Sequence, residues 1–389
     1  MVAAASLSTW LFAAEHYGHA PAGDFIPAQT STTEAVAGPK GPALRDDAVT
    51  PAVRDDAFRR AAVRPDPADV PAFQPLDQPV LPCRFLRDAP SGTSPKFSCV
   101  LEGGQVVKVK YGSNPEIQAE VAASQLVRAL GFAADDVTIV PRVRCYGCPR
   151  FPFITMQVLT LARATGVLGE HGYDDGYTDF EWAAVERKFP AQSIETDTLE
   201  GWAWWELPGS QAPRADLDAL RLLAVFLAHW DNKSGNQRLV CLDQGRRVQK
   251  DPAYDAAQQP CARPLLMIQD LGATFGPSKV NLVRWRELPI WADARRCRVS
   301  MHALPYRGAT FTDAEISEAG RLHVSRHLAA LDEGAVRRLF ADARFPEFYS
   351  GTDDARDLDA WTTAFRSRVD QIVNAGPCPS ASPAIASRE

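Results

Sequence analysis

Four side chains that could do chemistry follow an apolar helical run near the middle of the chain. The pattern H-x-D-x-K-x-x-N is formed there by His229, Asp231, Lys233 and Asn236. Such a polar segment after a buried helix is either a solvated loop, with Asp231 as a turn residue, or part of a site that binds metal and phosphate. The second alternative requires matching residues elsewhere in the chain.

Two further segments supply residues of the required types. Downstream, the apolar strand predicted at LLMIQD delivers Asp270 into DLGATFG, which contains a D-x-G pattern. Upstream, a strand predicted at 105–111 is followed by a helix that carries acidic residues. The chain therefore holds a lysine strand, an acidic helix, a polar loop and a D-x-G turn, in that order.

Taken together, these patterns resemble the protein-kinase-like fold, with its catalytic loop, its D-x-G metal motif, and its strand lysine with a helix glutamate. The resemblance concerns pattern and order over roughly residues 80 to 345. The D-x-G-x-x-F-G form is more similar to atypical, lipid and secretory-pathway kinases than to ordinary protein kinases. The resemblance implies a two-lobed α+β fold, with a β-rich N-lobe that holds one helix and a mainly helical C-lobe. It also implies ATP, with Mg²⁺ or Mn²⁺, as cofactors.

The resemblance assigns a role to each residue of the loop. Phosphoryl transfer depends mainly on placement and charge neutralisation, so Asp231 would orient the acceptor hydroxyl or accept its proton, and Lys233 would meet the transferred phosphate. Asn236 and Asp270 would bind the metal, because Mg²⁺ and Mn²⁺ prefer oxygen ligands. His229 would brace the loop.

The nucleotide would be bound by the strand, the helix and a turn. Lys108 and Lys110 share a strand face, and Lys110, nearer the strand end, is the expected phosphate contact; both could instead be solubilising charges on an edge strand. The expected partner of Lys110 is Glu120, in the middle of the following helix. Glu116 lies in the first turn of that helix, where a carboxylate simply favours the helix dipole. No G-x-G-x-x-G is present. The turn APSGTSP offers only Gly92, beside hydroxyls that could hold phosphate.

Composition and missing motifs exclude several classes of protein. The 389 residues carry a net charge of −6, so no global basic surface recruits nucleic acid. No apolar run reaches the roughly 18 residues of a membrane span. The hydrolase patterns G-x-S-x-G and H-E-x-x-H and the Walker A motif do not occur. The expected partners are a nucleotide and an acceptor of unknown type, protein or small molecule.

The eight cysteines favour disulfides in an oxidising compartment, and hence a periplasmic or secreted protein. Reduced, buried thiols in a cytoplasmic protein are the alternative. We predict that Cys241 and Cys261 are bridged. CYGC at 145–148 has zinc-knuckle spacing but no second pair at comparable spacing. Residues 1–23 form either an export signal or a disordered head, since no basic residue precedes Lys40.

The predicted elements define the expected domains. Three strands, 80–87, 96–101 and 105–111, form an antiparallel meander, and VTIVPRVRC and FITMQVLTL are two more strands. The Trp-rich segment 170–212 is expected to hold helices and loops, and 243–260 to be a hydrophilic insertion. The expected boundaries are a flexible leader at 1–75, an N-lobe at 76–160, a C-lobe at 161–376 and a tail at 377–389.

Three functions remain open from the sequence. The first is ATP-dependent phosphoryl transfer to a protein, lipid head group or small molecule. The second uses the same site for nucleotidyl transfer, although a base placed like Asp231 favours phosphoryl transfer. The third is a kinase-like pseudoenzyme or scaffold in the cell envelope, for which degraded motifs would be expected.

Overall fold

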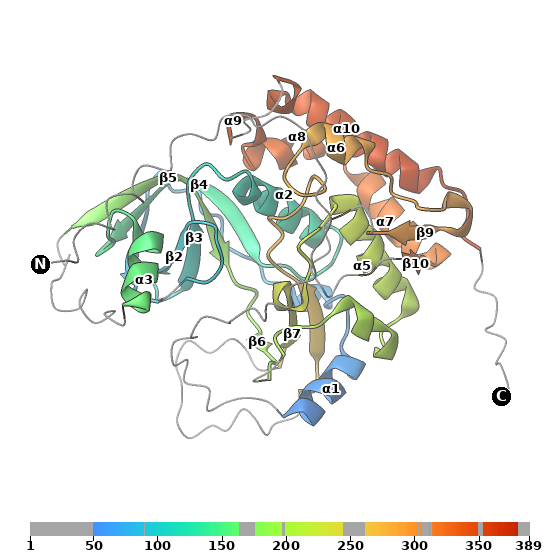
Figure 1. Ribbon diagram of the computed structural model, residues 1–389, viewed down its shortest axis with the longest axis horizontal. Helices are drawn as coiled ribbons and strands as arrows, with labels where there is room; N and C mark the ends of the chain where they lie inside the picture. The colour runs from blue at the N-terminus through green and yellow to red at the C-terminus, as the bar shows by residue number, and fades with distance from the viewer. Residues whose placement is uncertain are drawn as a thin grey trace, which may run out of the picture. The chain divides into compact units, whose positions relative to one another are not determined.

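The computed structural model describes residues 50–88, 90–162, 176–196, 199–243, 261–301, 304, 311, 313–348 and 353–379. All of them belong to one compact unit, Leu44–Glu389 (Figure 1). The first 49 residues and nearly all of the hydrophilic insertion predicted at 243–260 lie outside the described residues. The class is mixed α and β.

The first part of the described chain is a closed five-stranded barrel with the strand order β1-β2-β3-β5-β4. Its strands are β1 Leu81–Leu86, β2 Lys96–Leu101, β3 Val106–Lys110, β4 Asp136–Tyr146 and β5 Tyr177–Arg187. The predicted meander is confirmed, because β2 pairs antiparallel with both β1 and β3. Closure comes from β4, which pairs parallel with β1 and antiparallel with β5.

Two predictions about the barrel were wrong. The segment FITMQVLTL is not a strand but lies in helix α3, Pro152–Leu161, which begins with proline in its first turn. The fifth strand is instead β5, in the segment expected to hold helices and loops. The expected boundary at residue 160 therefore cuts the barrel, because β5 pairs with both β3 and β4.

The second part of the chain consists of a small sheet and the remaining helices. The sheet has the order β6-β7-β8, from Gln192–Ser193, Gln237–Cys241 and Pro264–Ile268, and a separate pair joins β9 and β10, Arg298–Ser300 and Asp313–Glu315. The helices are α5 Arg214–Leu227, α6 Leu282–Glu287, α7 Glu318–Ala330, α8 Glu333–Asp342, α9 Phe345–Phe348 and α10 Leu358–Val373. Helix α2, Glu116–Ala129, contacts β4 of the barrel and also α8 (Figure 1).

The predicted leader at 1–75 is wrong for its last third. Helix α1, Pro51–Arg60, buries Ala57 and Phe58 in the main core. After it, Ala62 forms a parallel bridge with Leu265 of β8. The segment has little apolar periodicity, but a few buried side chains and two backbone hydrogen bonds to β8 hold it.

The main core surrounds the aromatic residue of the D-x-G-x-x-F motif. Phe275 is fully buried, and its ring lies 5.0 Å from that of Trp285 and 5.5 Å from that of Phe345. Trp285 belongs to the same core. Phe275 therefore holds one end of the D-x-G loop in the helical part of the fold.

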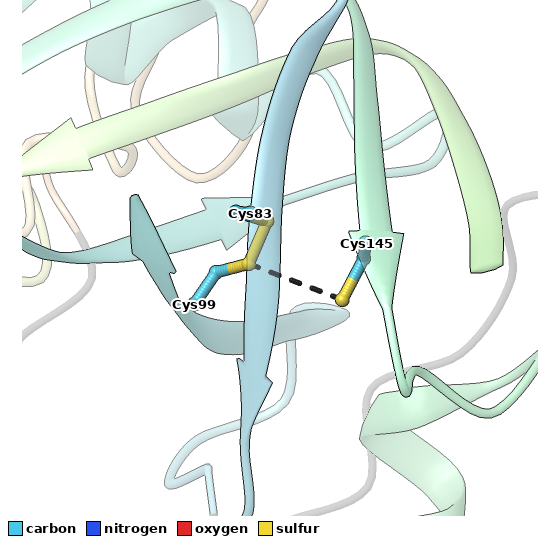
Figure 2. A group of neighbouring side chains, drawn as sticks. All are labelled: Cys83, Cys99 and Cys145. Atoms are coloured by element: carbon cyan, nitrogen blue, oxygen red, sulfur yellow. Dashed lines mark hydrogen bonds between the residues drawn. A yellow bond between two sulfur atoms is a disulfide. The ribbon is translucent and has the colours of Figure 1, made fainter. Parts of the chain in front are cut away.

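All eight cysteines are bonded in pairs, which confirms the predicted bridge between Cys241 and Cys261. The other pairs are Cys83–Cys99, Cys145–Cys148 and Cys297–Cys378. The last pair links Cys378, in the expected tail, to Cys297. The fold brings the CYGC pair close to a second pair, with 3.9 Å between the sulfurs of Cys99 and Cys145 (Figure 2). Four bonded pairs fit an oxidising compartment. None of the described helices has the length and apolar character of a membrane span.

Candidate active site

A cavity of about 480 Å³ brings together residues from separate parts of the chain. Seven of the nine predicted site residues line it: Gly92, Lys110, Glu120, Asp231, Lys233, Asn236 and Asp270. The walls come from the turn between β1 and β2, the end of β3, the start of α2, and the loops that follow α5 and β8. The other two predicted residues, Lys108 and His229, do not line it.

Lys110 is the centre of a buried charge cluster. The residue is 5% exposed, and its ammonium group pairs with Glu120 of α2, as predicted. It also lies 3.2 Å from Glu186 of β5 and 3.7 Å from Asp270. Three carboxylates thus surround one lysine. The sequence showed no motif that identifies Glu186; it becomes visible only once β5 is known to pair with β3.

The charges of this cluster are strongly perturbed. Burial disfavours the charged form of Lys110, but Glu120, Glu186 and Asp270 together raise its pKa well above the usual value. The pKa of Glu120 is raised to about 7, mainly by burial. The neighbouring carboxylates Glu186 and Asp270 raise it further, and Lys110 only partly opposes these effects. Perturbed carboxyl groups inside a cavity are typical of functional sites.

Lys108 has a different position from the one predicted for a phosphate contact. Its ammonium group lies 3.2 Å from Glu186, and its side chain is one-third exposed. Burial alone would raise the pKa of Glu186, but Lys108, Lys188 and Lys110 hold it well below the usual value. Lys108 therefore neutralises a buried carboxylate outside the cavity.

The polar loop after α5 is shaped by the backbone that precedes it. Ala228 takes a left-handed conformation with φ 55° and ends the helix, and the His229 N–H donates to Ala224 at 3.0 Å. The Trp230 N–H then donates to the carbonyl of Ala273 at 3.0 Å. This bond ties the polar loop to the D-x-G loop.

His229 does not line the cavity. The side chain is fully buried. Burial lowers its pKa to about 4, although Asp270 and Asp231 favour the charged form. A neutral, enclosed imidazole fits the bracing role that the sequence suggested, and beside it Asn232 donates to the His229 carbonyl at 2.7 Å.

Asp231, Lys233 and Asn236 all face the cavity. The Lys233 ammonium group lies 2.9 Å from both carboxylate oxygens of Asp231. The Asn236 amide N–H donates to the Asp231 carbonyl at 2.5 Å. Because a carbonyl accepts only from the amide nitrogen, the amide oxygen of Asn236 stays available for another ligand.

Asp270 follows β8 at a left-handed turn with φ 53°. Its carboxylate side chain is 52% exposed, which leaves it accessible from the cavity. Burial of its surroundings and the nearby Glu186 raise its pKa, but Lys110, Lys96 and Lys108 together outweigh them, so the pKa lies below the usual value. A charged, accessible carboxylate and the amide oxygen of Asn236 are hard oxygen donors of the kind that Mg²⁺ and Mn²⁺ take.

Two glycines allow these loops to approach their neighbours: Gly272, the glycine of the D-x-G motif, and Gly201, which the sequence did not single out. A Cβ at Gly272 would stand 2.9 Å from the Glu116 carbonyl oxygen, so the D-x-G loop packs directly on the start of α2. Gly201 has φ 65°, and a Cβ there would stand 2.2 Å from the Ser234 carbonyl oxygen of the polar loop. The D-x-G spacing marks Gly272, whereas the contact at Gly201 leaves no signal in spacing or periodicity.

Comparison with known proteins gives distant structural likenesses. No protein-family model matches the chain, and no curated protein matches it. Two solved kinases are similar to it. One is the Helicobacter pylori proinflammatory kinase CtkA, at 8% identity and a TM-score of 0.41, covering 75% of this chain and 96% of that one. The other is a Golgi casein kinase, at 12% identity and a TM-score of 0.34, covering 77% of this chain and 72% of that one.

Both of these proteins are kinases, the class that the motifs of this chain resemble. With identities this low and TM-scores below 0.5, the function of this chain has to be argued from its own residues.

Proposed function

We propose that the chain is an ATP-dependent phosphotransferase that requires Mg²⁺ or Mn²⁺, with the cavity between two kinase-like lobes as its active site. The observation that carries the proposal is the cavity itself. It joins the Lys110–Glu120 pair, the loop with Asp231 and Asn236, and Asp270, which come from separate segments. A cavity of about 480 Å³ falls within the size range of ligand sites in proteins.

The metal would be held by Asp270 and Asn236. Both offer oxygen atoms to the cavity, and the hydrogen bond from Asn236 to the Asp231 carbonyl fixes which side of its amide is free. A divalent cation supplies neutralisation of the charge that develops on the transferred phosphoryl group.

The chain's own residues would position the reactants. Asp231 would accept a hydrogen bond from the acceptor hydroxyl. It would take the proton of that hydroxyl as the bond from the acceptor oxygen to the γ phosphorus forms and the bond from this phosphorus to ADP breaks, so that ADP leaves. Lys233, which neutralises Asp231 in this structure, would turn to the transferred phosphate. The Lys110–Glu120 pair would help to orient the nucleotide phosphates.

Label transfer from ATP tests the proposal. The purified protein would be incubated with Mg²⁺ or Mn²⁺ and with ATP labelled at the α or the γ phosphate, beside the Asp270→Asn variant. We expect γ label on protein or released as phosphate, and its loss in the variant. α label on protein would instead establish nucleotidyl transfer. No label, and no thermal shift with either metal, would contradict both and favour a scaffold.

We also propose a periplasmic or secreted location. The four bonded cysteine pairs support it, because disulfides persist in oxidising compartments. Alkylation of the protein in its native cells, followed by mass spectrometry, tests the location. Free thiols at Cys241 and Cys261 without added reductant would contradict it.

A further inference from the structure

Most lysines around the cavity are already neutralised. Each of the following has a carboxylate within ion-pair distance: Lys110 with Glu120 and Glu186, Lys108 with Glu186, Lys188 with Asp135 and Glu186, and Lys233 with Asp231. Lys96 differs from them. It lines the cavity, as Lys110 and Lys233 do, yet no described carboxylate forms an ion pair with it.

Lys96 begins strand β2, and the strand register puts it directly opposite Lys110. Its side chain is half-buried and reaches under the turn between β1 and β2. The ammonium nitrogen lies 3.1 Å from the point that a Cβ at Gly92 would occupy. The charge is thus held at the cavity wall formed by the residues Ser91, Gly92, Thr93 and Ser94.

The position is electrostatically costly without a ligand. Burial lowers the pKa of Lys96, and repulsion from Lys110 and Lys108 lowers it further, against a weaker attraction from Asp270 and Glu120. A cation held in this way gains stability when an anion enters the cavity. Lys110 gains less, because three carboxylates already surround it.

We propose that Lys96, together with the hydroxyl-rich turn Ser91–Ser94, binds the phosphate chain of the nucleotide, and that Lys110 mainly orients Glu120. This inference rests on the proposed function for the identity of the anion as a nucleoside triphosphate. The chemistry it requires is more general, namely a polyphosphate anion beside a lysine that lacks a carboxylate. The turn has one glycine, so hydroxyls and a second lysine take the place of a glycine-rich loop.

Two neighbouring contacts support the turn as a formed binding surface. The Asn114 side chain, just before α2, donates to the Ser94 hydroxyl at 3.2 Å. It also donates to the carboxylate of Glu116, at 3.1 Å. The turn is therefore tied to the helix that carries Glu120, and an anion bound at Lys96 would lie beside both.

Binding measurements on charge variants test the inference. The full chain, Lys96→Gln, Lys96→Arg and Lys279→Gln would be titrated by calorimetry, with Mg²⁺ present, with ATP, adenosine and inorganic tripolyphosphate. Lys279 is an exposed lysine that does not line the cavity, so its variant is the matched control.

We expect Lys96→Gln to weaken ATP and tripolyphosphate binding about 10- to 100-fold, the size of a lost charge-assisted contact, and to leave adenosine binding unchanged. Lys96→Arg should restore most of the affinity, and Lys279→Gln should bind as the full chain does. A fold that had merely been damaged by the Gln substitution would lose adenosine binding as well.

Each other outcome is decisive. ATP bound equally well by the full chain and Lys96→Gln would overturn the inference and leave the proposed function standing. Tripolyphosphate bound through Lys96, without any ATP binding, would support the inference and contradict the proposed function. Binding of neither anion by the full chain would overturn both.

Discussion

The ammonium group of Lys110 lies 3.7 Å from the carboxylate of Asp270, although β3 and the loop after β8 are far apart in sequence. The barrel supplies the lysine and the small sheet supplies the carboxylate. Their contact spans the cavity and connects the two groups of residues that the sequence motifs predicted separately. Lys110 is therefore shared between helix α2, strand β5 and the D-x-G loop.

Asp231 is expected to act in turnover rather than in nucleotide binding. It lies in the polar loop, where Lys233 neutralises it, and it makes no ion pair with Lys110. Asp231→Asn should leave the ATP affinity unchanged and slow turnover about 10²- to 10⁴-fold, the usual contribution of a general base. Steady-state kinetics beside ATP titrations measure both quantities. Full activity in this variant would remove its assigned role.

Glu120 should make stability depend on pH between about 4.5 and 7. Its pKa is raised to about 7 in the folded protein, so the folded state binds a proton more tightly than the unfolded state. Stability therefore falls as pH rises through this window. The loss from this group is at most about 3 kcal/mol. Urea unfolding at pH 5 and pH 8 should show a larger decrease for the full chain than for Glu120→Gln, and equal decreases would contradict the pKa.

Gly201 is predicted to be irreplaceable because of its surroundings. Both Gly201 and Gly147 have left-handed backbones, with φ 65° and 70°. A Cβ at Gly201 would collide with the Ser234 and Gln237 carbonyls, whereas a Cβ at Gly147 meets nothing within 4 Å. Gly147→Ala should cost about 1 kcal/mol of strain. Gly201→Ala should cost several times more and displace the polar loop. Thermal unfolding and activity assays on the two variants test this difference.

Helix α1 is predicted to be part of the folded unit that supports the site. The buried Arg54 guanidinium lies 2.5 Å from the Glu206 carboxylate and donates to the Gly201 carbonyl at 2.8 Å. Arg54→Met would strand a buried carboxylate and should cost about 3–5 kcal/mol. Arg59→Met, at an exposed position on the same helix, should change stability by less than about 0.5 kcal/mol. Urea unfolding measures the stability of both variants. Equal stabilities would contradict the prediction that Arg54 of α1 holds this part of the folded unit.

The motifs predicted the site better than the periodicity predicted the fold. The polar loop, Asp270 and the Lys110–Glu120 pair all meet at one cavity. Their motifs could be recognised in the sequence because each lies at a turn or at the end of a strand or helix, where local structure fixes the spacing of the residues. The choice of Lys110 over Lys108 agrees with the geometry, since Lys110 ends its strand and Lys108 pairs outside the cavity.

The residues that the sequence missed depend on long-range pairing. Lys96 gains its position from the register of β2 against β3, and Glu186 gains its own from closure of the barrel. Helix α3 was mistaken for a strand because its uncharged run of Phe, Ile, Val, Leu and Thr suits both structures. Helix α1 carries only a few buried side chains, too few to distinguish it from a leader.

The central claim is that the cavity binds a nucleotide through a metal held by Asp270, and one binding measurement tests it most directly. ATP would be titrated by calorimetry into the full chain and into Asp270→Asn, each with Mn²⁺ and with a chelator. We predict binding by the full chain only when Mn²⁺ is present, and loss of that metal-dependent binding in the variant. Equal binding by both proteins, or binding by the full chain that ignores the metal, would contradict the claim.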